Sequence, residues 1–348
     1  MLLSIVVPLY NAQSYIPKCL DILLRQGIAD DQFEIIAVDD GSTDSTYELC
    51  RQLQQAHHQL VVVHQRNAGA GAARNRGIDL ANGEFLYFFD VDDDLDEGAL
   101  SELLFRCVQD NLDVLFFGGD VRYDNEAVAE TFHQDPRYFR RLQSPGIRNG
   151  EDMFIAQQSM GNFCAQPCML ITRLSFIRQK NVRFAEGIIN EDNLFVLHAT
   201  LRADRADVDQ RPLYHYCVHS GTVTTSNVNG EQRFLAHLVL ANEFERDRLE
   251  ALAHNKVELA ELIGRLVNWF IRISVESCPT ELETAGLLSN PHFSTNMLSA
   301  LLIRRLRDIM QDTMVAEPSS DLPQQESSQI KPRSIYRKIS GLLHRQWS

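Results

Sequence analysis

Long apolar segments and an excess of positive charge are both missing from this sequence of 348 residues. No stretch approaches the roughly 18 consecutive apolar residues that a membrane-spanning helix needs. The chain opens on a strand-like run, LLSIVVPLY, with no basic leader and no cleavage site, so we expect no signal peptide. Its formal net charge of −14 argues against a general nucleic-acid binder, and we expect no nucleic-acid partner.

Cysteine pairs at the spacing of metal ligands are also absent. The number of cysteines is odd, no CxxC motif occurs, and several lie in apolar patterns: Cys19, Cys50, Cys107, Cys164, Cys168, Cys217 and Cys278. This pattern favours buried free thiols in a reducing cytosol over disulfides or a zinc site. We therefore expect a cytoplasmic protein that is soluble or peripheral to a membrane.

The segment FLYFFDVDDDLD, residues 85–96, joins a short apolar run to a cluster of acids. The run follows the turn signal Asn82-Gly83, and its length and aromatic content predict a buried strand. The aspartates that crowd in after it are Asp90, Asp92, Asp93, Asp94 and Asp96. Carboxylates at the exit of a buried strand lie where open α/β folds bind ligands. So much negative charge favours a hard divalent cation, which takes carboxylate and phosphate oxygens as ligands.

Two plainer interpretations compete with a metal site here. Acidic runs are most often solvated loops. An EF-hand would begin at Asp90, but it requires a glycine where Leu95 stands and a bidentate glutamate where Ser101 stands. The strand in front of the acids, and the motifs elsewhere in the chain, favour the metal and phosphate interpretation.

Four apolar runs alternate with helical patterns in the first 95 residues. The predicted strands cover residues 2–7, 33–38, 60–64 and 85–89. This order indicates the nucleotide-binding half of an open α/β sheet with right-handed crossovers. The second strand ends in VDDGSTD, where Asp39 and Asp40 leave the strand together.

Small residues open the helix that follows the third strand. Gly69 and Gly71 precede it, and Arg74 lies in its first turns. Such a start lets a phosphate approach backbone N–H groups and pair with an arginine. A dinucleotide-binding turn is the rival interpretation, but its third glycine is missing and the strand is the third in the chain.

The rest of the predicted domain carries less regular signals. We expect helices over 100–108 and 173–179, strands over 114–117, 168–172 and 214–218, and hairpins and loops over 120–150. Glu191 and Asp192 begin a further helix, where acids are often only dipole-favourable caps. A polar loop over 219–226 could close over a ligand.

The chain becomes helical in character beyond residue 228. Residues 229–315 form a predicted helical C-terminal region, and residues 316–330 have the composition of a disordered linker. Residues 331–348 hold five lysines and arginines, no acid and an apolar stripe at helical spacing. This basic amphipathic tail favours an interfacial helix at the inner face of the cell membrane. The alternative is a helix that packs on its own domain or on a protein partner.

Four motifs, in this order, resemble the family-2 inverting glycosyltransferases of the GT-A fold. They are IVVPLYN (5–11), VDDGSTD (38–44), NAGAGAARNRGIDLANGEFLYFFDVDDDL (67–95) and INEDNLF (189–195). The resemblance covers about residues 1–225, and no single motif would carry it. It implies an α/β fold with a Rossmann-like open mixed sheet flanked by helices over residues 1–228, ahead of the helical C-terminal appendage.

The resemblance also implies which residues bind the donor. Pro8 and Tyr10 would line the nucleobase pocket. Asp39 would contact the base or the ribose, with Asp40 near it. Arg74 lies in the motif that approaches the nucleotide.

Metal, diphosphate and catalytic roles are implied in the same way. Asp90 and Asp92 match the DxD motif, with Asp92 expected to contact the metal and Asp90 the ribose or a water on the metal. The middle residue of that motif is usually small and is Val91 here. The last loop of the family often carries a basic residue before its serine. His219 stands at that position here, and we expect it at the diphosphate. Asp192 matches the catalytic base.

These roles agree with the chemistry of sugar transfer. A donor loses a nucleoside diphosphate, whose growing charge a Mn²⁺ or Mg²⁺ ion would stabilise. Inversion is a single displacement, so the acceptor hydroxyl needs a base on the opposite face of the sugar. The resemblance thus implies a metal-dependent, inverting glycosyltransferase of the hexosyltransferase type. It would move sugar from a nucleotide-sugar donor, commonly UDP-linked, to a glycan or lipid-linked glycan of a surface polysaccharide such as lipopolysaccharide.

Two other functions compete with this hypothesis. A sugar nucleotidyltransferase would carry a glycine-rich basic loop after the first strand, where this chain has PLYNAQSY. A non-catalytic nucleotide-sugar-binding protein would not need the full set of acids, which is intact at Asp39, Asp90, Asp92 and Asp192.

Overall fold

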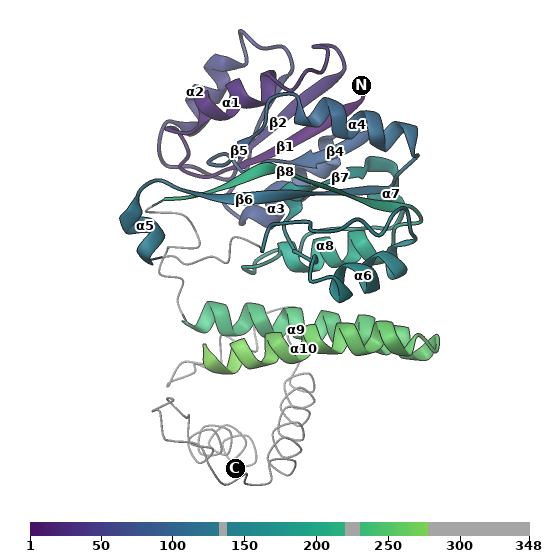
Figure 1. Cartoon of the computed structure of the whole chain (residues 1–348). Helices are drawn as coiled ribbons and strands as arrows, with labels where there is room; N and C mark the ends of the chain where they lie inside the picture. Colours follow the sequence, from purple (N-terminus) through teal and green to yellow (C-terminus); the bar gives the residue numbers. More distant parts are fainter. Residues whose placement is uncertain (132–137, 220–229, 278–348) are drawn as a thin grey trace.

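The structure is a computed structural model, which describes residues 1–131, 138–219 and 230–277. Its centre is an eight-stranded mixed sheet with the strand order β3-β2-β1-β4-β7-β6-β8-β5 (Figure 1). The strands are β1 (Leu3–Leu9), β2 (Phe33–Asp39), β3 (Leu60–His64), β4 (Phe85–Phe88), β5 (Asp94–Leu95), β6 (Val114–Tyr123), β7 (Leu170–Arg173) and β8 (Ala206–Val218).

Helices cover both faces of the sheet. On one face lie α1 (Ile16–Leu24), α2 (Thr46–Leu53) and α4 (Ala99–Gln109), and on the other lie α3 (Ala70–Leu80), α6 (Gly150–Ser159) and α8 (Asp192–Leu201), as Figure 1 shows. The shorter elements are α5 (Glu126–Thr131), a 3₁₀ turn (Pro167–Met169) and α7 (Leu174–Gln179). The α/β class and the mixed, helix-flanked sheet predicted from the sequence are confirmed.

The first four strands run parallel and create the point where ligands are expected. β1 pairs in parallel with β2 on one side and with β4 on the other. Every residue of β2 is buried, and so is all of β1 except Pro8, which explains the unbroken apolar runs of the sequence. The chain adds β2 and β3 on one side of β1 and then returns to its other side. That reversal makes a topological switch point between β1 and β4, at their carboxyl ends.

The prediction of hairpins and loops over 120–150 is wrong at both ends. β6 continues to Tyr123, α5 follows it, and α6 begins at Gly150. The late strand also starts at Ala206, earlier than the predicted residue 214. The sequence hides this long β6–β8 pair because its pairing shifts register near Gly118 and because β8 carries acids in its first half.

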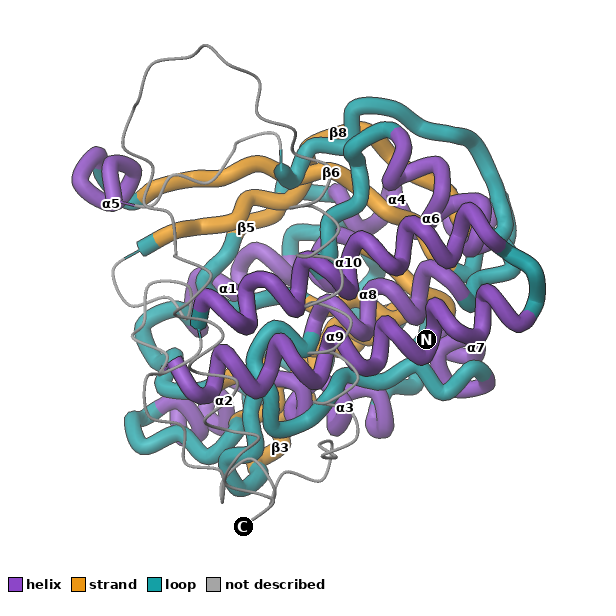
Figure 2. Tube along the Cα trace, turned by 90° about the horizontal axis from the view of Figure 1, so that it is seen from below, coloured by secondary structure: helices purple, strands orange, loops and turns teal. Residues whose placement is uncertain are grey.

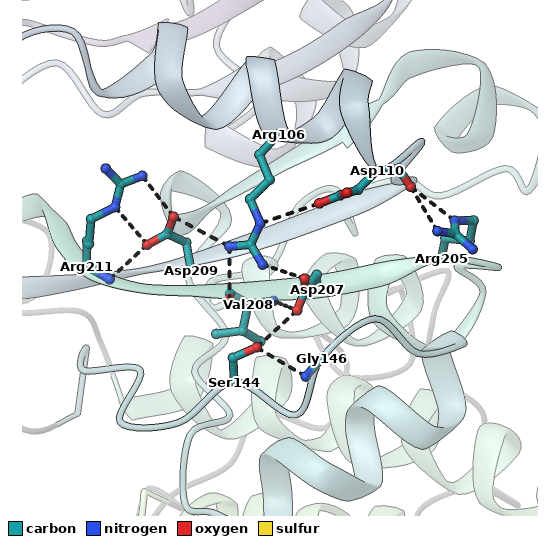
Figure 3. A network of polar contacts seen from close by, with 9 residues as sticks. All are labelled: Arg106, Asp110, Ser144, Gly146, Arg205, Asp207, Val208, Asp209 and Arg211. Atoms are coloured by element: carbon teal, nitrogen blue, oxygen red, sulfur yellow. Dashed lines mark hydrogen bonds and ion pairs between the residues drawn. The ribbon is translucent and has the colours of Figure 1, made fainter.

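A network of ion pairs holds those acids of β8 in the sheet (Figure 3). Arg106, on α4, donates hydrogen bonds to Asp207 and lies 3.5 Å from a carboxylate oxygen of Asp209. Arg211 donates through Nε to Asp209 at 3.0 Å. Ser144 donates to the other oxygen of Asp207 at 3.1 Å. Paired in this way, the carboxylates can occupy a buried strand without an uncompensated charge.

A second apolar core joins the helical appendage to the sheet domain. The hairpin of α9 (Gly230–Ala253) and α10 (Val257–Glu276) lies against α6 and α8, as the view from below shows (Figure 2). Buried side chains of all four helices form this core, among them Phe154, Leu197, Leu238 and Phe270. A polar pair adds to it, because His198 Nε2 lies 3.0 Å from Asp247 Oδ2. The base-bearing helix of the predicted site is therefore packed directly on the appendage.

Several predictions fall outside the described residues. These are most of the loop over 219–226, the helical region beyond residue 277, the linker over 316–330 and the tail over 331–348. Among the described helices, none is both long enough and apolar enough to cross a bilayer. The cysteines at positions 19, 50, 107, 164 and 168 are buried free thiols, as predicted, and Cys217 is partly exposed.

Candidate functional site

The predicted site residues gather at the switch point of the sheet. Pro8 lies near the end of β1, half-buried, and Tyr10 follows the strand with 54% of its surface exposed. Asp39 ends β2, while Asp90 follows β4, the other neighbour of β1. The carboxyl ends of three parallel strands thus bring together residues that are far apart in the sequence.

The two acids at the exit of β2 have different surroundings. Asp40 accepts hydrogen bonds from Gln65 Nε2 at 2.8 Å, from the backbone N–H of Ala68 at 2.9 Å and from that of Gly69 at 2.8 Å. It therefore holds the turn that leads into α3. Asp39 is fully buried and contacts His64 Nδ1 through Oδ2 at 2.6 Å. Its second oxygen, Oδ1, has no hydrogen-bond partner among the described residues.

Arg74 connects the two ends of the site. From α3 it donates to Asp90 Oδ1 at 2.8 Å and to Glu191 Oε1 at 2.7 Å, and it lies over the ring of Phe184. Arg74 is only 7% exposed, whereas its two partners are partly exposed. The paired carboxylates raise the pKa of Arg74 despite its burial. The predicted donor-side arginine is thus paired through both terminal nitrogens with acids of the protein itself, while its Nε has no hydrogen-bond partner among the described residues.

The neighbours of Arg74 on α3 hold the same distant segment. Asn75 donates to the carbonyl of Phe184 at 3.0 Å and accepts from its backbone N–H at 3.0 Å. A Cβ on Gly71 would come within 2.6 Å of the Ala185 carbonyl oxygen, so only glycine permits this approach. Helix α3 therefore clamps residues 184–191 beside the acidic cluster.

Asp92 is held by an aromatic pair. His219 Nε2 lies 2.9 Å from Asp92 Oδ2, and the other ring nitrogen of His219 lies 3.2 Å from the Tyr15 hydroxyl. The rings of Tyr15 and His219 stack with centroids 5.1 Å apart. The fold therefore brings His219, which is predicted to lie at the diphosphate, to the DxD motif through Asp92.

The acidic cluster is electrostatically suited to a divalent cation. Burial and the charge of Asp90 raise the pKa of Asp92, and burial with the charges of Asp92 and Asp90 raises the pKa of Asp93 well above its usual range. A cation held by Asp90 and Asp92 would relieve this repulsion. In the described part of the chain, no three or more His, Cys, Asp or Glu side chains gather as a metal site. Two carboxylates fit a cation that takes further ligands from substrate phosphates.

The remaining acids of the cluster have structural partners. Asp93 is buried and accepts from the Tyr214 hydroxyl and from the Cys217 backbone N–H. Asp94 pairs with Arg122 at 3.0 Å. Asp96 lies 2.8 Å from His215 Nε2. These bonds tie the acidic turn to β6 and β8, which leaves Asp90 and Asp92 as the candidate ligands of a cation.

Asp192 occupies the first position of α8, next to Glu191, which is one of the two acids bonded to Arg74. Its Oδ1 accepts from the backbone N–H and the side chain of Asn193, both at 2.9 Å. Burial and the neighbouring charge of Glu191 raise the pKa of Asp192 to about 7, while Arg74 acts in the opposite direction. A carboxyl group with a pKa near neutral can take up a proton at physiological pH.

Sequence reasoning missed three residues of this arrangement, His64, Asn75 and Tyr15, and also the pairing of Glu191 with Arg74. His64 had a usable signal. It ends the third strand, and a parallel register places it directly beside Asp39. The Arg74–Glu191 pair spans 117 residues and has no local signal.

Comparisons with known proteins agree with this geometry. Residues 4–171 match the family model described as Glycosyl transferase family 2. The uncharacterized glycosyltransferase YibD of Escherichia coli (strain K12) is 29% identical over 251 residues, which cover 70% of this chain and 71% of that protein. The poly(ribitol-phosphate) beta-N-acetylglucosaminyltransferase TarS of Staphylococcus aureus (strain Mu50) is 26% identical over 296 residues, covering 82% of this chain and 49% of that protein.

A solved structure shares the fold. The crystal structure of S. aureus TarS 1-349 in complex with UDP-GlcNAc superposes with a TM-score of 0.61 at 23% identity, covering 80% of this chain and 82% of that one. The sheet topology and the acids at its switch point define a glycosyltransferase of the GT-A fold. Residues 4–171 belong to glycosyl transferase family 2, and the chain is similar to the poly(ribitol-phosphate) glycosyltransferase TarS.

Proposed function

We propose that this glycosyltransferase is inverting and metal-dependent, and that it moves a sugar from a UDP-linked donor to a hydroxyl group of a glycan or lipid-linked glycan in surface polysaccharide biosynthesis. The observation that carries the proposal is Asp192, a half-buried carboxyl with a pKa of about 7. It is tied to the acidic cluster through Glu191, Arg74 and Asp90. A base is thereby held in a fixed relation to the donor site, as a single displacement requires.

The donor side would bind the nucleotide at the exits of β1, β2 and β4. Pro8, Tyr10 and Asp39 would contact the nucleoside. Asp90 and Asp92 would hold Mn²⁺ or Mg²⁺, which stabilises the charge of the departing diphosphate. His219, already bonded to Asp92, would stand beside the same phosphates. The UDP-GlcNAc in the TarS structure supports a UDP-linked donor.

We propose indirect roles, without direct nucleotide contact as the main one, for two residues of the predicted donor site. Asp40 has three donors of its own and would shape the turn before α3 rather than touch the nucleotide. Arg74 would act by joining Asp90 to Glu191, with its own hydrogen bonds to ligand limited to what remains of the guanidinium.

A thermal-shift screen of nucleotide sugars, with and without Mn²⁺, tests the donor directly. Ligand that binds only the folded state raises the melting temperature, so a UDP-sugar should stabilise the protein more with Mn²⁺ than without it. Release of UDP that depends on an added glycan acceptor would then establish transfer. Binding of a UDP-sugar without turnover in the presence of acceptors would instead support a non-catalytic nucleotide-sugar-binding protein.

We also propose a separate role for each of four segments of the chain. Residues 1–228 would be the catalytic domain, residues 229–315 the helical region, residues 316–330 a linker and residues 331–348 a tail that holds this cytoplasmic enzyme at the inner face of the membrane. Sedimentation with anionic vesicles compares the full chain with a variant that lacks residues 331–348. Loss of vesicle binding in the shortened protein is expected, and equal sedimentation would remove the membrane role of the tail.

A further inference from the structure

The two acids at the end of β2 differ in how many of their carboxylate oxygens have hydrogen-bond partners. Asp40 is saturated by three donors from the residues after β3. Asp39, one residue earlier and completely buried, keeps Oδ1 without a partner among the described residues. A buried carboxylate oxygen without a donor is costly, so such an atom in a native protein points to a missing ligand.

His64 determines which oxygen of Asp39 stays free. The parallel register of β2 and β3 places His64 beside Asp39, and the backbone N–H of Gln65 donates to the Asp39 carbonyl at 2.9 Å. The imidazole then meets Oδ2 through Nδ1 at 2.6 Å. A neutral or charged His64 can donate from Nδ1, and that bond leaves Oδ1 as the remaining acceptor.

The imidazole is itself supported from the side. The ring of Tyr47, the second residue of α2, lies with its centroid 5.0 Å from that of His64 at an interplanar angle of 51°. The side chain of His64 is nevertheless 51% exposed. His64 can therefore be replaced without opening a cavity in the core.

We propose that His64 is a positioning residue for recognition of the nucleobase, which fixes Asp39 so that Oδ1 accepts the ring N–H of a base that carries an imide or lactam. This inference rests on the proposed function, because it takes the nucleotide to lie at the exit of β2. Uracil offers such a donor at N3 and guanine at N1, whereas N3 of cytosine is an acceptor. A fixed carboxylate would attract the first two bases and repel cytosine.

The test is calorimetric binding of UDP, GDP and CDP to the full chain and to three variants. Wild type should bind UDP or GDP at least about tenfold more tightly than CDP, the scale of one hydrogen bond to a charged group. His64→Ala should weaken the preferred nucleotide by about tenfold and CDP much less, so that the selectivity ratio falls. His64→Asn should restore both, because its amide nitrogen can donate from nearly the position of Nδ1.

His58→Ala is the matched control, since His58 is an exposed histidine in the turn before the same strand. It should leave every affinity unchanged. Wild-type selectivity and affinity retained in His64→Ala would overturn the positioning role, and so would an equal loss for all three nucleotides or a wild-type preference for CDP. Failure of wild type to bind any nucleotide would overturn the proposed function instead. Melting temperatures of the variants identify a folding defect, and His64→Asn then decides the outcome.

Discussion

Residues 1–95 and residues 114–219 build the same site in different ways. In the first region, consecutive strands and helices deliver Asp39 and Asp90 to one edge of a parallel sheet. In the second, Asp192 and His219 lie on segments that follow strands of mixed direction. Contacts with the first region, from Arg74 to Glu191 and from His219 to Asp92, hold these segments at that edge. The proposed donor half is therefore fixed by local topology. The proposed acceptor half, around Asp192, depends on long-range bonds such as the one from Arg74 on α3 to Glu191.

The two regions also differ in the electrostatic surroundings of their aspartates. Asp92 has a histidine partner and lies among other acids, so its surroundings favour a cation. Asp192 receives hydrogen bonds only from Asn193 among those described, and its pKa of about 7 is suited to proton transfer. Two carboxylates of the same type thus have environments that favour different chemical roles.

The largest effect is expected when the acceptor half loses its proposed base. Asp192→Asn should lower kcat by about 10²- to 10⁴-fold, because the amide cannot take the proton of the acceptor hydroxyl. The dissociation constant of UDP should stay within about twofold, since Asp192 is not in contact with the acids of the donor half. Initial rates of UDP release and calorimetry measure the two quantities. Asp204→Asn, an exposed acid just beyond α8, is the control. Near-normal turnover in Asp192→Asn would remove Asp192 as the base.

The matching test of the donor half is Asp92→Asn. This change should lower kcat by about 10²- to 10³-fold, because less of the leaving-group charge is neutralised. It should also abolish the gain in UDP affinity that Mn²⁺ produces in wild type. Glu97→Gln, an exposed acid just after the cluster, should behave as wild type. An unchanged Mn²⁺ dependence in Asp92→Asn would contradict the metal role.

The sequence predicts the donor half better than the acceptor half, for physical reasons. Buried parallel strands such as β2 and β4 leave apolar runs, and their exits mark Asp39 and Asp90 directly. The start of β8 is masked because Asp207 is charged, and its partners Arg106 and Ser144, which make that position compatible with a strand, are distant in the sequence. Likewise, nothing near Arg74 in the sequence indicates that its partner is Glu191.

The link between the halves can be weakened at Arg74. Arg74→Lys keeps the positive charge, but a single ammonium cannot reproduce two separate guanidinium bonds, so one of Asp90 and Glu191 loses its donor. We expect kcat to fall by about 10-fold and the free energy of unfolding by about 2–4 kcal/mol, because a buried carboxylate is left unpaired. Arg76→Lys, two residues further along the same helix and exposed, is the matched control. Equal behaviour of the two variants in kinetics and denaturation would show that the bridge is dispensable.

A smaller effect is expected from pH. Asp192 must be ionised to accept a proton, so kcat/KM should fall about tenfold for each pH unit below a midpoint near 7. Arg74→Met should move this midpoint upward, because the positive charge of Arg74 lowers the pKa of Asp192. Rates across pH 5 to 9 in both proteins measure the shift. A downward shift, or a rate independent of pH in this range, would contradict the assignment.

The smallest effect concerns the appendage behind α8. Asp247→Asn weakens the 3.0 Å contact between His198 on α8 and Asp247 on α9, and should cost about 1 kcal/mol of stability. Because Phe154, Leu197, Leu238 and Phe270 still hold the four helices together, kcat should change by less than about twofold. Glu250→Gln, exposed on α9, controls for the altered charge. A large loss of kcat at unchanged stability would mean that the polar contact, rather than the apolar core, sets the position of Asp192.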